Sequence, residues 1–137
     1  MRTLIILVLL LSVAGIAQPV ISGEAAGEID VSENADAKAI QQNLQEIGTN
    51  VFPCLIKASG EGKSDAEAEA YCFCKNRSLV ESHLMEIKKL RGKHPEWQGK
   101  MLKVVSGSPD DRETHRFGDP QIGEIESSLE QASNTCR

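Results

Sequence analysis

The chain has 137 residues, of which 15 are basic and 20 acidic, giving a formal net charge of −5. This length predicts one domain, and the excess of acid disfavours nucleic acid and anionic lipid surfaces, which carry charge of the same sign. No basic stripe with interleaved aromatic residues offsets the global charge, so we expect no nucleic-acid partner.

The N-terminus has the layout of a secretory signal peptide. Arg2 supplies a positive start, and residues 4–13 are apolar apart from Ser12. The small residues Gly15 and Ala17 then precede a possible cleavage point, which is the usual pattern of an export signal. A membrane anchor is the alternative, but it needs about 20 apolar residues and this run ends too early. We therefore expect residues 1–17 to be removed, leaving an exported protein, periplasmic or secreted, with no membrane association.

Removal of residues 1–17 takes away one basic residue and no acid, which leaves 14 basic and 20 acidic residues and a net charge of −6. Residues 18–34 contain one proline, two glycines and four acids, with no sustained apolar period. This composition predicts a flexible acidic leader. The folded domain is then expected over residues 35–137.

A first helix is predicted between a start near Ser32 to Asp36 and an end near Lys57, because apolar residues recur at spacings of four and three. Gly48 and Pro53 weaken helical hydrogen bonding inside this stretch, so we expect a kink or short break between them. The apolar stripe consists of Ile40, Leu44, Ile47, Val51 and Cys54.

A long central helix is predicted from Ser64 to Arg91, after a turn with two glycines at residues 58–63. Ser64 and Glu67 have the spacing of a capping box, in which each side chain bonds the other residue's backbone N–H. The helical period then places one apolar line on this helix, with a cysteine on either flank. The line and its flanks are Phe73, Val80, Leu84 and Ile87, with Cys72, Leu79 and Leu90 to one side and Cys74 and Met85 to the other.

Two further helices are predicted after Gly92. Pro95 suits the first turn of a short third helix, whose buried side would hold Met101, Val104, Val105 and Trp97, the last as a core residue. Residues 106–118 are polar and predict a long loop. Asp119 and Pro120 then open a C-terminal helix with the stripe Ile122, Ile125, Leu129, Ala132 and Cys136. The predicted fold is all-α, a small bundle of about four helices around the long central one.

The four cysteines are Cys54, Cys72, Cys74 and Cys136, an even number in an exported chain, which indicates two structural disulfides. Residues two apart on a helix point about 200° apart, so Cys72 and Cys74 cannot bond to each other. Cys54 lies about one turn before the connection at residues 58–63, and Cys72 lies about two turns after it. At a rise of about 1.5 Å per residue, Cys72 lies closer than Cys74 to the height of Cys54 along the axis of an antiparallel helical hairpin. The predicted pairs are Cys54–Cys72 and Cys74–Cys136.

A metal or thiol-redox site is the alternative use of the Cys-x-Cys motif. His83, His94 and His115 would then supply further ligands for zinc or copper(I). However, the strong paired Cys-x-x-Cys spacings are absent, and the histidines match no ligand template. We expect His83 at the edge of a helical face, His94 at a helix start and His115 in the loop. No metal and no other cofactor is therefore expected.

A cluster of charged residues near the predicted loop could hold calcium or a carboxylate, but the EF-hand pattern is missing. The cluster consists of Asp110, Asp111, Arg112, Glu113 and Arg116. A solvated group of charges is the simpler interpretation. No nucleophile-elbow sequence surrounds any serine, so no catalytic residue is predicted and a hydrolase would need an unrecognised site.

One segment carries a resemblance to other proteins. Cys54, the glycine-containing turn, the Ser64 capping sequence with Ala-Glu-Ala and the run Tyr71-Cys72-Phe73-Cys74 resemble a pattern of small exported bacterial helical proteins without an assigned activity. The resemblance covers residues 54–74 and implies a disulfide-stapled helical hairpin. The leading functional hypothesis is therefore an exported interaction or structural module. Its partner would be another envelope or extracellular protein, or a small apolar ligand.

Overall fold

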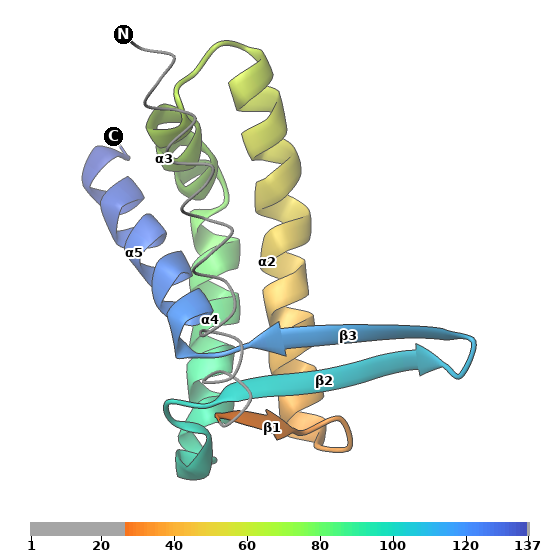
Figure 1. Ribbon diagram of the computed structural model, residues 1–137. Helices are drawn as coiled ribbons and strands as arrows, with labels where there is room; N and C mark the ends of the chain where they lie inside the picture. Colours follow the sequence, from red (N-terminus) through yellow and green to blue (C-terminus); the bar gives the residue numbers. More distant parts are fainter. Residues whose placement is uncertain (1–26, 137) are drawn as a thin grey trace, which may run out of the picture.

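The computed structural model describes residues 27–136, which form four α-helices, one 3-10 turn and a three-stranded sheet (Figure 1). The helices are α2 (Ala35–Gly60), α3 (Asp65–Lys75), α4 (Arg77–Gly92) and α5 (Asp119–Thr135). The strands are β1 (Glu28–Asp30), β2 (Met101–Ser108) and β3 (Asp111–Phe117), and the 3-10 turn η1 is Pro95–Trp97. The predicted signal peptide and residues 18–26 of the predicted leader lie outside the described residues.

Helices α3 and α4 stand end to end as a central column, with α2 along one side and α5 along the other (Figure 1). Helix α2 packs on both parts of the column, whereas α5 packs mainly on α3. In the part of the chain from residue 27 to residue 136, no helix combines the length and apolar character that crossing a membrane requires.

Helix α2 begins on a side-chain cap. The Oδ1 atom of Asn34 accepts a hydrogen bond from the backbone N–H of Ala37 at 3.0 Å, which satisfies one of the free donors of the first turn. The helix is then continuous to Gly60 with Pro53 inside it, so the break considered between Gly48 and Pro53 is absent. Packing of the buried face offsets the hydrogen bond that the proline removes. The buried residues are Ala37, Ile40, Ile47, Val51 and Ala58.

The long helix predicted over residues 64–91 is two helices. Its predicted capping box is confirmed: Ser64 Oγ accepts from the Glu67 backbone N–H at 3.3 Å, and a Glu67 carboxylate oxygen accepts from the Ser64 backbone N–H at 2.9 Å. The interruption lies at Asn76, where φ is −103° and ψ is 15°. The Asn76 side chain donates to the carbonyl of Cys72 at 2.9 Å. The backbone N–H of Asn76 donates to the same carbonyl at 3.1 Å, and Asn43 and Asn50 make the same side-chain bond inside the continuous α2, so this bond does not by itself explain the break.

The segment predicted as a short third helix and a long loop is a β-hairpin, so that prediction is wrong. Strand β2 pairs antiparallel with β3, with Leu102 opposite Phe117 and Ser108 opposite Asp111. Leu102 and Val104 are buried while Lys103 between them is half-exposed, which is the period of two that a strand requires. The fold is mostly helical with a small sheet, rather than all-α.

Strand β1 takes up part of the predicted leader. Residues 28–30 pair in parallel with residues 101–103 of β2, and the backbone N–H of Val31 donates to the carbonyl of Lys103 at 2.9 Å. Ser32, a predicted cap, instead accepts a hydrogen bond from the backbone N–H of Val105 at 2.9 Å. These residues are fixed on the sheet, and the prediction of a flexible leader does not hold for them.

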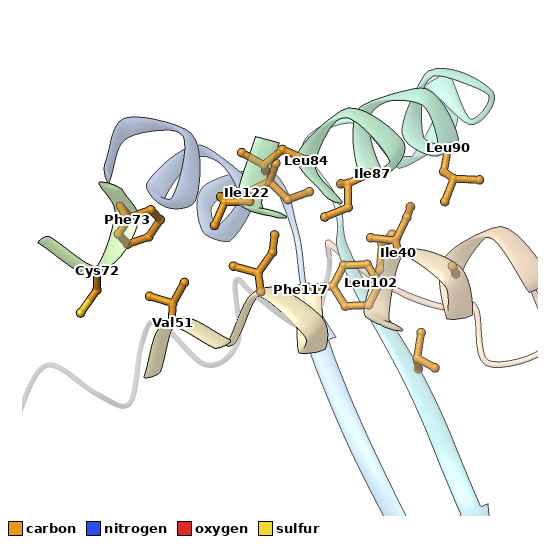
Figure 2. Close-up of a cluster of buried hydrophobic side chains, with 14 of the residues drawn as sticks. Ile40, Val51, Cys72, Phe73, Leu84, Ile87, Leu90, Leu102, Phe117 and Ile122 are labelled. Carbon is orange, nitrogen blue, oxygen red and sulfur yellow. The ribbon is translucent and has the colours of Figure 1, made fainter. Parts of the chain in front are cut away.

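The buried apolar side chains form one cluster that joins the helices to the sheet (Figure 2). Val51, Phe73 and Leu84 fill the space between the helices. Leu102 and Phe117, at the inner half of the hairpin, belong to the same cluster and so pack the sheet onto the helices. Residues 107–114 at the outer half of the hairpin are exposed, and in Figure 1 this half extends past α2.

Candidate interaction surface

The four cysteines lie in two pairs at disulfide distance. Cys54 on α2 pairs with Cys72 on α3, with their Cα atoms 5.7 Å apart. Cys74 on α3 pairs with Cys136, which follows α5, with Cα atoms 5.6 Å apart. This is the predicted pairing. The two bridges tie α2 and α5 to opposite sides of α3, and no free cysteine remains among the described residues.

The three histidines have separate neighbours. His83 Nδ1 lies 2.7 Å from Asn43 Oδ1, and because the Asn43 amide donates to the carbonyl of Ala39, this contact joins α4 to α2 with the imidazole as donor. His115 is on β3 rather than in a loop, with Nε2 3.4 Å from a Glu113 carboxylate oxygen. Among residues 27–136, no group of three or more histidine, cysteine, aspartate or glutamate side chains is arranged to hold a metal ion. The described residues thus give no support to the metal-site hypothesis.

His94 precedes η1 and fastens it to the start of α2. Its Nε2 atom lies 3.0 Å from Asp36 and its Nδ1 atom 2.9 Å from Glu96. Hydrogen bonds to these carboxylates, the one to Asp36 first, raise the pKa of His94. The His94 ring also stacks on Trp97, with ring centroids 3.8 Å apart. Trp97 is buried, as predicted for a core residue, so we assign this cluster a structural role.

The charged cluster predicted around residues 110–116 is distributed along the exposed hairpin. Asp110 and Asp111 lie at its tip, and Arg112 is paired in register with Gly107 on β2. Arg116 donates from Nε to Glu28 on β1 at 2.8 Å, which links β3 across β2 to the opposite edge of the sheet. The residues do not converge on one point, and the interpretation as solvated charges is sufficient.

Large apolar side chains on the surface give a different signal. The exposed fraction is 63% for Phe52 and 60% for Ile56, which lie one turn apart on α2. Tyr71 is also exposed, but the ammonium of Lys63 lies 5.5 Å from the centroid of its ring. Phe52 and Ile56 lie off the apolar stripe predicted for the first helix, so neither was predicted as a functional residue. Their spacing of four was the available signal.

A groove of 530 Å³ between α2 and α3 is lined by Ile56, and Phe52 lies one helical turn before Ile56, outside the lining. Its α2 wall is formed by Leu55, Ile56 and Ser59, and its α3 wall by Asp65, Ala68, Glu69 and Phe73. We call Phe52 together with these seven residues the docking surface. Cys54–Cys72 joins the same two helices and fixes their separation next to the groove. The surface therefore combines a rigid frame with unburied apolar side chains.

A second groove, of 610 Å³, lies between α4 and α5 and exposes Met85. An ion pair between Lys88 and Glu126 joins the two helices at this groove, and Glu81 on its rim is paired with Arg77. Much of its rim charge is therefore neutralised within the protein. It offers one strongly exposed apolar side chain, compared with two on the docking surface.

Comparison with known proteins finds no family model, no curated protein and no solved structure that matches this chain. The resemblance to small exported bacterial proteins therefore stays a prediction. Function has to be argued from the geometry of the docking surface.

Proposed function

We propose that this protein is an exported interaction module that binds another envelope or extracellular polypeptide through the docking surface. The exposure of Phe52 and Ile56 beside an apolar groove carries the proposal. Full burial of such a side chain contributes about 1.5–3 kcal/mol of favourable free energy. The folded monomer does not gain this free energy at Phe52 or Ile56, and a partner that covers both residues would do so on binding. Adjacent exposed apolar residues rimmed by polar ones are typical of a protein-binding site.

The frame around the surface supports the same proposal. Helices α2 and α3 are bonded to each other by Cys54–Cys72, and α3 is bonded to the end of α5 by Cys74–Cys136. A surface held in one shape loses little conformational entropy when a partner binds, so more of the contact energy appears as affinity. Disulfides persist in oxidising compartments, and the signal-like N-terminus agrees with export to one.

Site-specific photo-cross-linking in cells that make the protein tests the proposal. A benzophenone amino acid at position 52 should give a discrete adduct with one polypeptide, and Ile56→Asp in the same chain should abolish it. The matched control carries the probe at position 85, which is 70% exposed but belongs to the other groove. Adducts at position 52 no stronger than those at position 85 would refute the proposal.

A further inference from the structure

We infer that the segment bound by the docking surface is a basic amphipathic helix. This inference rests on the proposed function and adds the chemistry of the partner. Three features of the surface carry it: the line of apolar residues on α2, the helical nature of both groove walls, and the charge of the groove lining.

The apolar line matches a helix in length and spacing. Phe52, Leu55 and Ile56 lie at spacings of three and four on α2, the polar Ser59 follows them one turn further on, and Ala68 and Phe73 line the groove from α3. A partner helix that presents apolar residues at positions i, i+3 or i+4, and i+7 can lie along this line with its side chains in the groove.

The backbone of the groove walls also favours a helix over a strand. Both walls are α-helices whose backbone N–H and C=O groups are bonded within each helix. An extended segment bound there would find no backbone partners and would leave its own polar groups unpaired on desolvation. A helical segment satisfies its backbone internally and needs only side-chain contacts.

The charges at the groove select a basic partner. Asp65 and Glu69 are its only charged lining residues, and neither forms an ion pair within residues 27–136. Glu69 accepts a hydrogen bond from the hydroxyl of Ser128 on α5. A lysine or arginine beside the apolar face of the partner would meet Asp65 and Glu69, neither of which is ion-paired within residues 27–136, whereas an acidic segment would be repelled.

The same charges argue against a second copy of this chain as the occupant. A symmetric dimer through the docking surface would join two copies of a patch whose charged lining residues are both acidic, so no opposite charge of the patch would meet Asp65 or Glu69. The whole chain, with a net charge of −5, adds repulsion of the same sign. A partner with positive charge is therefore the better match.

Fluorescence anisotropy with the purified oxidised protein and three labelled model peptides tests the inference. The first peptide is a helix with a leucine face and flanking lysines, the second carries glutamate in place of each lysine, and the third scrambles the first so that the face is lost. We expect the first to bind at least about tenfold tighter than the others. Its affinity should fall as salt is raised, because the attraction is partly electrostatic.

Variants locate the binding on the docking surface. Phe52→Ser should weaken binding of the first peptide about tenfold or more, while Phe52→Trp retains it. Asp65→Asn with Glu69→Gln should weaken it about three- to tenfold, and glutamine at position 69 can still accept from Ser128. The control, Asp110→Asn with Glu124→Gln, removes the same charge from the hairpin tip and from α5 and should change affinity less than about twofold.

Three results would overturn the inference. They are equal or tighter binding of the acidic peptide, an equal loss of affinity in the control variant, and self-association of the wild type that Phe52→Ser abolishes in sedimentation experiments. None of these results contradicts the proposed function if position 52 still cross-links to another polypeptide in cells. Conversely, loss of that cross-link refutes the proposed function whatever the peptides do. Circular dichroism of each oxidised variant verifies that reduced binding does not reflect unfolding.

Discussion

Breaking the Cys74–Cys136 bridge should cost more free energy of unfolding than breaking Cys54–Cys72. A disulfide restricts the unfolded chain, and the restriction grows with the length of the closed loop. The two bridges close loops with sequence separations of 62 and 18 residues, and these loops do not overlap. The chain-entropy relation then gives about 4 kcal/mol for the longer loop and about 3 kcal/mol for the shorter one at 25 °C.

Direct replacement of each pair would confuse this comparison, because Cys72 is fully buried and its truncation would also leave a cavity. We would instead remove one bridge by alanine substitution and compare the oxidised and reduced forms of the remaining one in the same polypeptide. Urea unfolding would be followed by circular dichroism of the helices and by fluorescence of Trp97, which is buried in the folded state.

The loss of unfolding free energy on reduction should be about 1 kcal/mol larger for Cys74–Cys136 than for Cys54–Cys72. Equal losses, or a larger loss for the shorter loop, would refute the loop-entropy reasoning. They would show that structure remaining in the reduced unfolded chain, rather than loop length, sets the contribution of each bridge.

Three other perturbations have outcomes that the structure determines. Stabilisation by the charged His94 is complete below its ordinary pKa of 6.5 and is lost as the pH rises through the raised pKa of the folded state. The urea stability of His94→Gln should therefore fall less than that of the wild type as the pH rises above 6.5. Gly107 has a φ of +94°, and a Cβ there would overlap the facing carbonyl of Asp111 on β3. Gly107→Ala should therefore lower the free energy of hairpin opening, measured by amide hydrogen exchange, by about 1–3 kcal/mol. Gly48→Ala, where a Cβ has free space on α2, is the control. Asp119→Ala leaves the guanidinium of Arg91, whose side chain is 12% exposed, without its ion-pair partner, and should lower the urea unfolding free energy by about 1.5–3 kcal/mol.

The cysteine pairing was predictable because it depends on quantities that a sequence contains. The rise per residue and the position of the glycine turn set the relative heights of Cys54 and Cys72. The helical period set the opposite directions of Cys72 and Cys74. The break at Asn76 did not affect either inference, since both of these cysteines precede it on α3.

The hairpin was missed because two periods fit the same residues. Met101, Val104 and Val105 match one side of a helix, and so they were assigned to one. The competing signal was the alternation of Leu102, Lys103 and Val104, followed by a turn sequence with glycine and proline. Neighbouring β-branched valines should have favoured the strand. The sequence signal for strand β1 was weaker still, because three residues are too few to show an alternating pattern and their partner strand is distant in the chain.

The docking surface could not be derived from the sequence, since it depends on how α2 is rotated against α3. Phe52 and Ile56 lie beside the apolar stripe of α2, where another element could have covered them. Only the three-dimensional packing shows that α4 and α3 take the main stripe and leave these two residues in water. Their spacing indicated a shared face but not whether that face was buried.

The position of the bridges explains how the fold tolerates this exposure. Helix α3 buries three side chains, Ala68, Cys72 and Phe73, whereas α4 buries four aliphatic side chains and also adjoins the sheet end of the core. The α3 end of the bundle therefore has the smaller core, and both disulfides lie there. Each bridge contributes about 3–4 kcal/mol, comparable with the about 1.5–3 kcal/mol from burying one more large apolar side chain. Cross-links thus compensate for the smaller core at this end, where Phe52 and Ile56 stay exposed.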